Sequence, residues 1–150
     1  MINEDFYYLE VVRAVLTKNV TVEEQALHSI IGFKIIADRL DAEWPAEDPA
    51  IVIDTFGGDE AHGTEGNVVH PTLDVWCYGA VVDVSRSQQN SVALERAVAK
   101  VLNGALDRKN EFGTLMSAVR ERPSTNEWDP DMERPFQRAT YRTWFSTLTA

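Results

Sequence analysis

The chain has 150 residues and a formal net charge of −10, from 24 acidic and 14 basic residues. This length predicts a single domain, 1–150, that buries roughly 70% of its unfolded surface and needs no disulfide or metal for stability. The acidic balance disfavours tight nucleic-acid binding, which depends on neutralising phosphates with Lys and Arg.

The single cysteine, Cys77, excludes an internal disulfide and favours a reducing compartment. No apolar run approaches the roughly 18 residues that span a bilayer. The chain begins MINEDFYY, which is acidic where a signal peptide is basic. We therefore expect a soluble protein that is intracellular when made.

The first part of the chain predicts two helices. Apolar residues recur at three- and four-residue spacing over 4–17, which indicates an amphipathic helix with Asn3 as its N-cap. Thr21 is the expected N-cap of a second, short helix, because two glutamates follow it and suit the positive end of the helix dipole. Gly32 is expected to end this helix.

Three strands are predicted next. Residues 33–40, FKIIADRL, alternate weakly, whereas 50–56, AIVIDTF, form a stronger strand that ends at a glycine-rich loop. The clearest strand is 70–79, HPTLDVWCYG, in which both faces are expected to be at least half covered. Its alternation places Leu73, Val75 and Cys77 on one face and Asp74, Trp76 and Tyr78 on the other.

The longest helix is expected to begin at Ser85 or Ser87. Its spacing predicts one buried apolar stripe and an opposite polar face in water. The stripe comprises Leu94, Val98, Val101, Leu102 and Ala105, and the polar face comprises Glu95, Arg96, Lys100 and Asn103.

The last third of the chain predicts a closing hairpin. Gly113 closes the turn after the long helix, and 114–122 read equally as a strand or a short helix. The Asp129-Pro130-Asp131 stretch has turn chemistry. Residues 136–148 then alternate as a long two-sided strand, with Ala139, Tyr141, Thr143 and Phe145 on one face and Arg138, Thr140, Arg142 and Trp144 on the other.

Helices and strands therefore mix without a regular strand–helix–strand rhythm. This order predicts an α+β fold, in which one largely antiparallel sheet of about four to five strands packs against helices.

The loop 57–67, GGDEAHGTEGN, contains the letters DEAH, which can mark a magnesium-binding strand end in helicases. ATP hydrolysis also needs a G-x-x-x-x-G-K-[ST] loop to hold the phosphates, and this sequence has none. We therefore expect no ATP hydrolysis. Four glycines in eleven residues instead predict a mobile loop.

No pattern of residues indicates a catalytic, cofactor or metal site. His62 and His70 lie near carboxylates, but they are eight residues apart and match no metal motif, so a solvated acidic loop is the favoured interpretation. Cys77 lacks a neighbouring base. Ser85 and Ser87 lack a G-x-S-x-G turn. We expect no enzyme; the alternative is a small metal-dependent hydrolase built on Asp59, Glu60, His62 and His70.

The order of elements resembles that of the tail terminator, or tail completion, proteins of long-tailed bacteriophages. The resemblance rests on the helix 4–17, the strand and loop AIVIDTFGGDEAHGTEG, the unit from HPTLDVWCYG to SRSQQNSVALERAVAKVLNGAL, and the closing hairpin DPDMERPFQRATYRTWF. It covers most of the chain, although residues 19–32 are longer than the corresponding connection.

This resemblance implies a structural virion protein without cofactors. Six copies would form a ring on the last ring of the tail tube, stop its polymerisation and provide the surface for head–tail joining. The implied partners are the tail tube protein and the head-side neck or connector proteins, while DNA passes through the lumen without specific binding and no membrane is involved. The implied location is the head-proximal end of the virion tail, reached from the host cytoplasm. The alternative is a head-completion or neck adaptor of the same virion.

Two sets of residues are candidates for contacts in such a particle. The acidic loop would face a partner or the lumen, and broad side chains on the two best strands would form the subunit interface, if they do not simply pack within the sheet. The loop set is Asp59, Glu60, His62 and Glu65; the interface set is Trp76, Tyr78, Arg138, Arg142 and Trp144.

Overall fold

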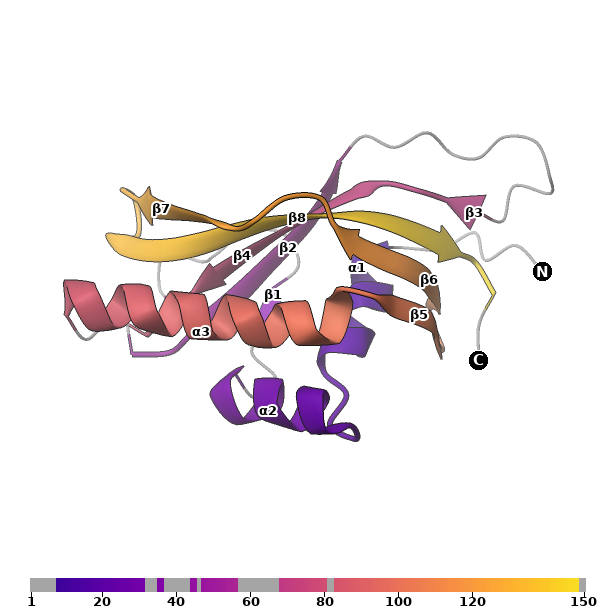
Figure 1. The fold of residues 1–150 in the computed structure, drawn as a ribbon, viewed down its shortest axis with the longest axis horizontal. Coiled ribbons are helices and arrows are strands. Elements are labelled where there is room, and N and C mark those ends of the chain that lie inside the picture. Colours follow the sequence, from indigo (N-terminus) through magenta and orange to yellow (C-terminus); the bar gives the residue numbers. More distant parts are fainter. Residues whose placement is uncertain are drawn as a thin grey trace.

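The computed structural model describes residues 8–31, 35–36, 44–45, 47–56, 68–80 and 83–148. These residues form one sheet whose helices lie on a single face (Figure 1). The elements are α1 (Tyr8–Leu16), α2 (Val22–Ile31), β1 (Ile35–Ile36), β2 (Ala50–Phe56), β3 (Val68–Val69), β4 (Thr72–Tyr78), α3 (Val84–Leu102), β5 (Ala105–Asn110), β6 (Gly113–Arg120), β7 (Thr125–Asp129) and β8 (Arg134–Ser146).

The expected α+β class is confirmed, and the sheet is larger than expected. Its main path runs β1-β2-β4-β8-β6-β5, with β3 and β7 also paired to β8, so the described residues contain eight strands. All pairs are antiparallel except β1 with β2. The surplus over four to five strands comes from two-residue strands and from β5 and β7, which lack a strong alternating apolar pattern.

Strand β8 is the spine of the sheet. Its 13 residues pair with β4 and then β3 along one edge, and with β7 and then β6 along the other. The predicted alternation is confirmed: Ala139, Tyr141 and Phe145 are buried against the helices. Because β8 has partner strands along both edges, most of its backbone N–H and C=O groups form hydrogen bonds within the sheet, and this stabilises so long a strand.

The core lies between the sheet and the helices. Leu73, Val75 and Cys77 of β4 are fully buried there with Leu9 and Leu16 of α1. Each such aliphatic side chain contributes about 1.5–3 kcal/mol by leaving water. The expected helix 4–17 is thus confirmed over its described part, and Asn3 lies outside the described residues.

Helix α2 begins at a capping box, as expected for Thr21. The Thr21 Oγ1 atom accepts a hydrogen bond from the backbone N–H of Glu24 at 3.1 Å, and the Glu24 carboxylate accepts one from the Thr21 N–H at 2.9 Å. Each side chain therefore satisfies a donor that the first helical turn leaves unpaired.

Helix α3 begins at Val84, one residue before the first serine that we considered. Its N-cap is Asp83, whose carboxylate accepts a hydrogen bond from the Arg86 N–H at 2.9 Å. The start at Ser85 or Ser87 was wrong because aspartate satisfies the free N–H groups as well as serine does. The helix ends at Leu102, so Ala105 belongs to β5, although it is buried as expected.

One predicted solvent-facing residue of α3 is buried. Glu95 is 3% exposed and forms an ion pair with Arg120 of β6. The expectation was wrong because helical spacing treats every carboxylate as a surface group, whereas a nearby arginine on the sheet compensates the charge of this one.

The hairpins in the second half of the chain decide the structure of residues 114–122 and confirm the turn predicted at Asp129. Residues 113–120 form a strand, β6, because β5 and β8 pair with its two edges. The turn expected at Asp129 joins β7 to β8, and the Asp129 carboxylate accepts hydrogen bonds from the N–H groups of Asp131 and Met132 at 3.0 and 3.1 Å. This local arrangement is the reason why Asp favours turns.

Candidate subunit interface on the outer sheet face

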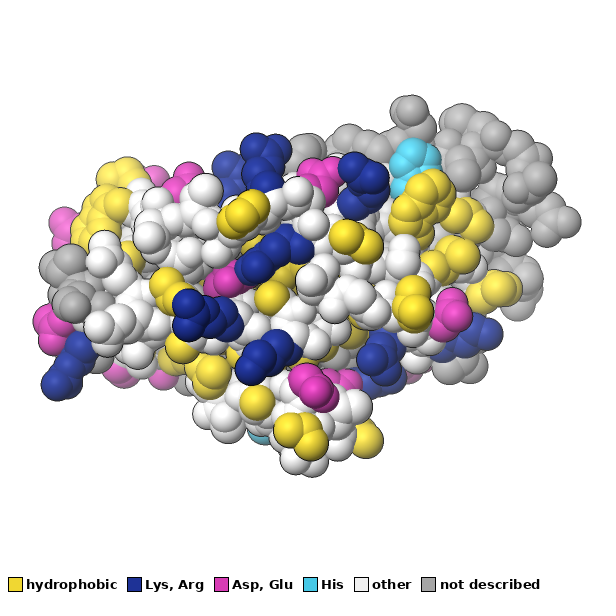
Figure 2. All heavy atoms as spheres, viewed as in Figure 1, with side chains coloured by type: hydrophobic (Ala, Val, Ile, Leu, Met, Phe, Trp, Pro, Cys, Tyr) yellow, Lys and Arg dark blue, Asp and Glu magenta, His cyan; other side chains and the backbone are white. Residues whose placement is uncertain are grey.

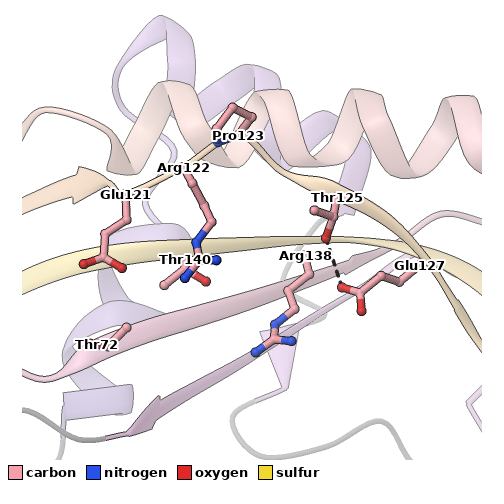
Figure 3. A pocket seen from close by; sticks show the side chains of 8 residues that line it. All are labelled: Thr72, Glu121, Arg122, Pro123, Thr125, Glu127, Arg138 and Thr140. Atoms are coloured by element: carbon pink, nitrogen blue, oxygen red, sulfur yellow. Dashed lines mark hydrogen bonds between the residues drawn. The ribbon is translucent and has the colours of Figure 1, made fainter.

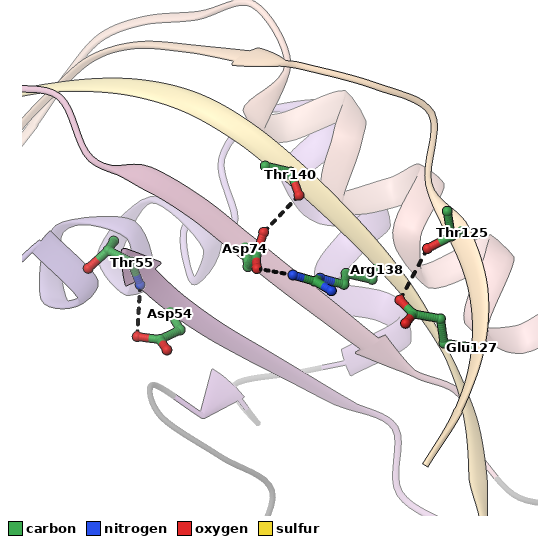
Figure 4. Close-up of polar contacts among 7 residues, drawn as sticks. All are labelled: Asp54, Thr55, Asp74, Thr125, Glu127, Arg138 and Thr140. Carbon is green, nitrogen blue, oxygen red and sulfur yellow. Dashed lines mark hydrogen bonds and ion pairs between the residues drawn. The ribbon is translucent and has the colours of Figure 1, made fainter. Parts of the chain in front are cut away.

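The outer face of the sheet, opposite the helices, is centred on a buried carboxylate. Asp74 of β4 accepts hydrogen bonds from Arg138 Nη2 at 2.8 Å and from Thr140 Oγ1 at 2.7 Å, both on β8 (Figure 4). Asp54 of β2 lies directly opposite Asp74 in the strand register. Like charges at such positions repel, so the Arg138 guanidinium is the group that stabilises this pairing.

Arg138 is fixed by two further features. Its guanidinium lies 5.6 Å from the centre of the Trp76 ring, within range of a cation–π interaction. The hydrogen bond to Asp74 raises the pKa of Arg138 above its usual value, so this side chain is always charged. Trp76 and Arg138 are therefore held by contacts within the chain, while 42% of the Arg138 side chain stays exposed, and their role as interface residues stays a prediction.

Tyr78 is on the same face of β4 but is almost completely buried. It is 6% exposed, with the Phe136 ring 5.1 Å away and the Arg134 guanidinium 5.7 Å from its ring centre. Its hydroxyl donates to Asp129 at 2.9 Å, and burial together with this carboxylate raises the pKa of Tyr78 well above its usual range. Tyr78 thus offers almost no surface to a neighbouring subunit.

The accessible part of the face lies toward the other end of β8. Trp144 is 40% exposed and its ring stacks 4.7 Å from that of His70. Arg142 is exposed and lies 3.5 Å from the Glu121 carboxylate, a distance at which a surface ion pair contributes little. In Figure 2 a histidine lies beside hydrophobic side chains at the upper right of the molecule, where β3 is found in Figure 1.

Two apolar side chains that we did not single out from the sequence extend this surface. Leu106 of β5 is 68% exposed and Val119 of β6 is 55% exposed. Ser117 pairs with Leu106 on one side and with Trp144 on the other, so these side chains share one face of three adjacent strands. We call Leu106, Val119, Arg142 and Trp144 the outer patch; adjacent exposed apolar groups of this kind are typical of protein contacts.

The signal for the two missed residues was present but ambiguous. Leu106 falls in a stretch that we assigned to the end of the long helix, and Val119 falls in the stretch that read equally as strand or helix. Strand alternation places Val119 on the outer face only once that stretch is known to be a strand.

A hollow of about 340 Å³ separates the outer patch from the Asp74 centre. Arginine and glutamate side chains both project into it, and Thr125 Oγ1 donates to the Glu127 carboxylate at 3.1 Å (Figure 3). Its lining contains three threonines and two glutamates and no cysteine, serine or histidine. Its lining residues are Thr72, Glu121, Arg122, Pro123, Thr125, Glu127, Arg138 and Thr140.

Within the part of the chain that the structure describes, no three His, Cys, Asp or Glu side chains come together to hold a metal ion. His70 packs on Trp144, and Cys77 is fully buried. Among the described helices, none is long and apolar enough to cross a membrane. The other candidates in the acidic loop, Asp59, Glu60, His62 and Glu65, lie outside the described residues.

Comparison with known proteins identifies the fold. No family model matches the sequence, and no curated protein matches it. Among solved structures, 21 chains match. One is a chain of the virion of a native gene transfer agent particle, with 14% sequence identity, a TM-score of 0.65, and coverage of 92% of this chain and 93% of that one. This chain therefore shares, over nearly its whole length, the fold of a protein found in a gene transfer agent virion.

Proposed function

We propose that this chain is a structural protein of a phage-like virion and acts as a tail terminator. The observation that carries the proposal is the end-to-end fold match to a chain of a gene transfer agent virion, in which neither chain has a large part left over. A match of this kind supports a shared architectural role more than a match confined to one motif, although fold alone does not determine function.

In this role six copies form a ring that caps the tail tube, stops its growth and receives the head-side neck proteins. The outer patch supports an assembled state, since Leu106, Val119 and Trp144 expose apolar area that a neighbouring protein would cover. Arg142 beside them adds a group that is common at interface cores. DNA crosses the lumen without specific binding, and the acidic loop as a partner or lumen contact stays a prediction.

The test is a particle preparation that lacks this protein. We expect tail tubes that exceed their normal length or fail to join heads, seen by electron microscopy, and normal infectious particles would contradict the proposal. Heads that lose DNA while tails keep their normal length would instead identify a neck adaptor. ATP or metal-dependent hydrolysis by the pure protein would identify an enzyme.

The outer patch is tested by complementation with single variants. Trp144→Ala should fold normally and fail to restore tail joining, because it removes an exposed aromatic contact. Ile30→Ser on α2 is the matched control, since Ile30 and Trp144 are both 40% exposed. Equal complementation by the two variants would exclude the outer patch from the assembly surface.

A further inference from the structure

Charged side chains of neighbouring elements gather near each end of α3. The helix has 19 residues, so its ends are about 28 Å apart. Figure 2 shows several acidic side chains and a basic side chain at the left-hand end, where the β7–β8 hairpin lies, whereas basic side chains outnumber acidic ones over the middle and right of the same face.

At one end, the turn between β7 and β8 presents an exposed aromatic ring beside two carboxylates. Trp128 is 52% exposed, and Asp131 and Glu133 are exposed. No ion pair joins either carboxylate to a cation of the described residues. Asp129 holds the turn through its hydrogen bonds to two backbone N–H groups, so these side chains sit on an ordered support. We call Trp128, Asp131 and Glu133 the acidic tip.

At the other end, three cations from separate elements surround a hollow of about 250 Å³. Lys18 precedes α2, Lys100 lies in the last turn of α3, and Arg108 lies on β5. Within the described part of the chain, none of the three forms an ion pair. We call Lys18, Lys100 and Arg108 the basic hollow; its other lining residues are Val15, Thr21, Glu23, Glu24 and Val101.

The two glutamates of the hollow differ in their availability. Glu24 is buried, and one carboxylate oxygen already accepts hydrogen bonds from the N–H groups of Thr21 and Val20 in the capping box. Glu23 is exposed and is therefore the one carboxylate that an acidic ligand would meet. Beside the hollow, Val20 and Val22 are each 78% exposed, which provides apolar area for an aromatic ring.

We infer that the acidic tip of one copy docks on the basic hollow of the next copy. The charges are complementary, and the exposed Trp128 on one side meets exposed valines on the other, which is the combination that fixes register and supplies affinity at interfaces. Because α3 separates the two features within one chain, the contact is between copies. It is head-to-tail, and such contacts generate rings when they close. The inference deepens the proposed ring by naming a subunit contact that is distinct from the outer patch.

Disulfide trapping in purified protein tests this contact even when association is weak. Met132→Cys places a thiol on the turn of the tip, and Val22→Cys places one beside the hollow. With oxidised glutathione as the oxidant, we expect the mixture of these two variants to form a covalent heterodimer at least about tenfold faster than Met132→Cys mixed with Ala93→Cys, which lies at an exposed position of α3 outside both proposed surfaces. Equal rates would overturn the inference; Cys77 is buried and does not compete.

Charge reversal provides an independent test. Asp131→Lys with Glu133→Lys should slow the Met132–Val22 cross-link by about tenfold, as should Lys100→Glu with Arg108→Glu. A pair of copies in which one carries the reversed tip and the other the reversed hollow should recover the rate. Trp128→Ala should also slow it, whereas Glu23→Gln should accelerate it. Failure of the paired reversal to recover the rate would contradict the docking.

The two proposals fail in different experiments. Head-to-tail trapping in a protein whose absence leaves tails unchanged would preserve the contact and remove the terminator function. Normal tail termination by a variant with a reversed hollow would preserve the function and remove the contact.

Discussion

Glu95 of α3 and Arg120 of β6 form an ion pair between helix and sheet, in which the side chain of Glu95 is 4% exposed and that of Arg120 is 26% exposed. The pair joins the longest helix to the half of the sheet that carries the outer patch. Burying two opposite charges together is roughly neutral, whereas removing one partner leaves the other without compensation.

We therefore expect Arg120→Ala to lower the free energy of unfolding by about 3 kcal/mol. Glu95→Ala should cost less, because Arg120 is partly exposed and its charge can be hydrated. The double change Glu95→Leu with Arg120→Met should restore most of the stability. Urea unfolding measures all three variants, and a loss below about 1 kcal/mol for Arg120→Ala would contradict the role of the pair.

Gly79, the residue that follows β4, packs directly against the backbone of α3. A Cβ atom there would lie 2.6 Å from the Ser87 carbonyl oxygen and 2.6 Å from the Ser91 nitrogen, both backbone atoms of the helix. Gly79→Ala must therefore displace α3, at a cost of about 3 kcal/mol.

Gly104 is the matched control, since a Cβ there has no neighbour within 4 Å. Its positive φ of 82° predicts a cost of about 1–2 kcal/mol for alanine from backbone strain alone. Thermal unfolding of the two variants distinguishes these causes, and equal losses would show that helix packing at Gly79 is not limiting.

Arg134 anchors the segment before β2 to the sheet. It is 1% exposed, and its Nη2 atom donates to the backbone carbonyls of Asp48 and Gly79 at 2.7 Å each. Burial lowers the pKa of Arg134. Arg134→Met leaves two carbonyls unpaired and should destabilise the fold by about 2–5 kcal/mol. Arg134→Lys should cost less, because an ammonium group can still donate to one of them; an equal loss in urea unfolding would argue against the hydrogen bonds.

The buried thiol of Cys77 should make the folded protein less stable at alkaline pH. Burial raises the pKa of its thiol far above the value of about 8.5 in an unfolded chain. Above that pH the unfolded state releases a proton that the folded state retains, so stability should fall by up to about 1.4 kcal/mol per pH unit. Unfolding free energies between pH 8 and 10 measure this slope. Cys77→Ala should be less stable at pH 8 but lack most of the slope, and an unchanged slope would assign it to other groups.

The sequence by itself determined the features that local patterns control. Strict alternation marked both faces of β4 and β8, because a strand places successive side chains on opposite sides. Thr21 and Asp129 were recognisable because a short polar side chain bonds to backbone groups within three residues of itself. The fold class followed from the order of these elements.

Tertiary structure decided what depends on partners distant in the chain. Glu95 is buried only because Arg120 lies across from it, and Tyr78 is covered by Phe136 and Arg134 of a strand more than fifty residues away. Strands β5 and β7 are poor strands by composition; each pairs in a hairpin with the strand that follows it, and these partners, β6 and β8, are in turn held by their other pairings within the sheet.

Some residues of the candidate contact surfaces could be recognised from the sequence, and others only from the folded structure. Trp144 and Arg142 were identified from the sequence, since broad and charged side chains alternate outward on β8. Leu106 and Val119 joined them only once three strands were in register. The basic hollow unites residues 18, 100 and 108, which no local pattern connects; packing of α2 and α3 beside β5 brings their charges together. Long-range packing is a property of the whole chain, and this is why charge complementarity between the two ends of α3 could be seen only in the folded molecule.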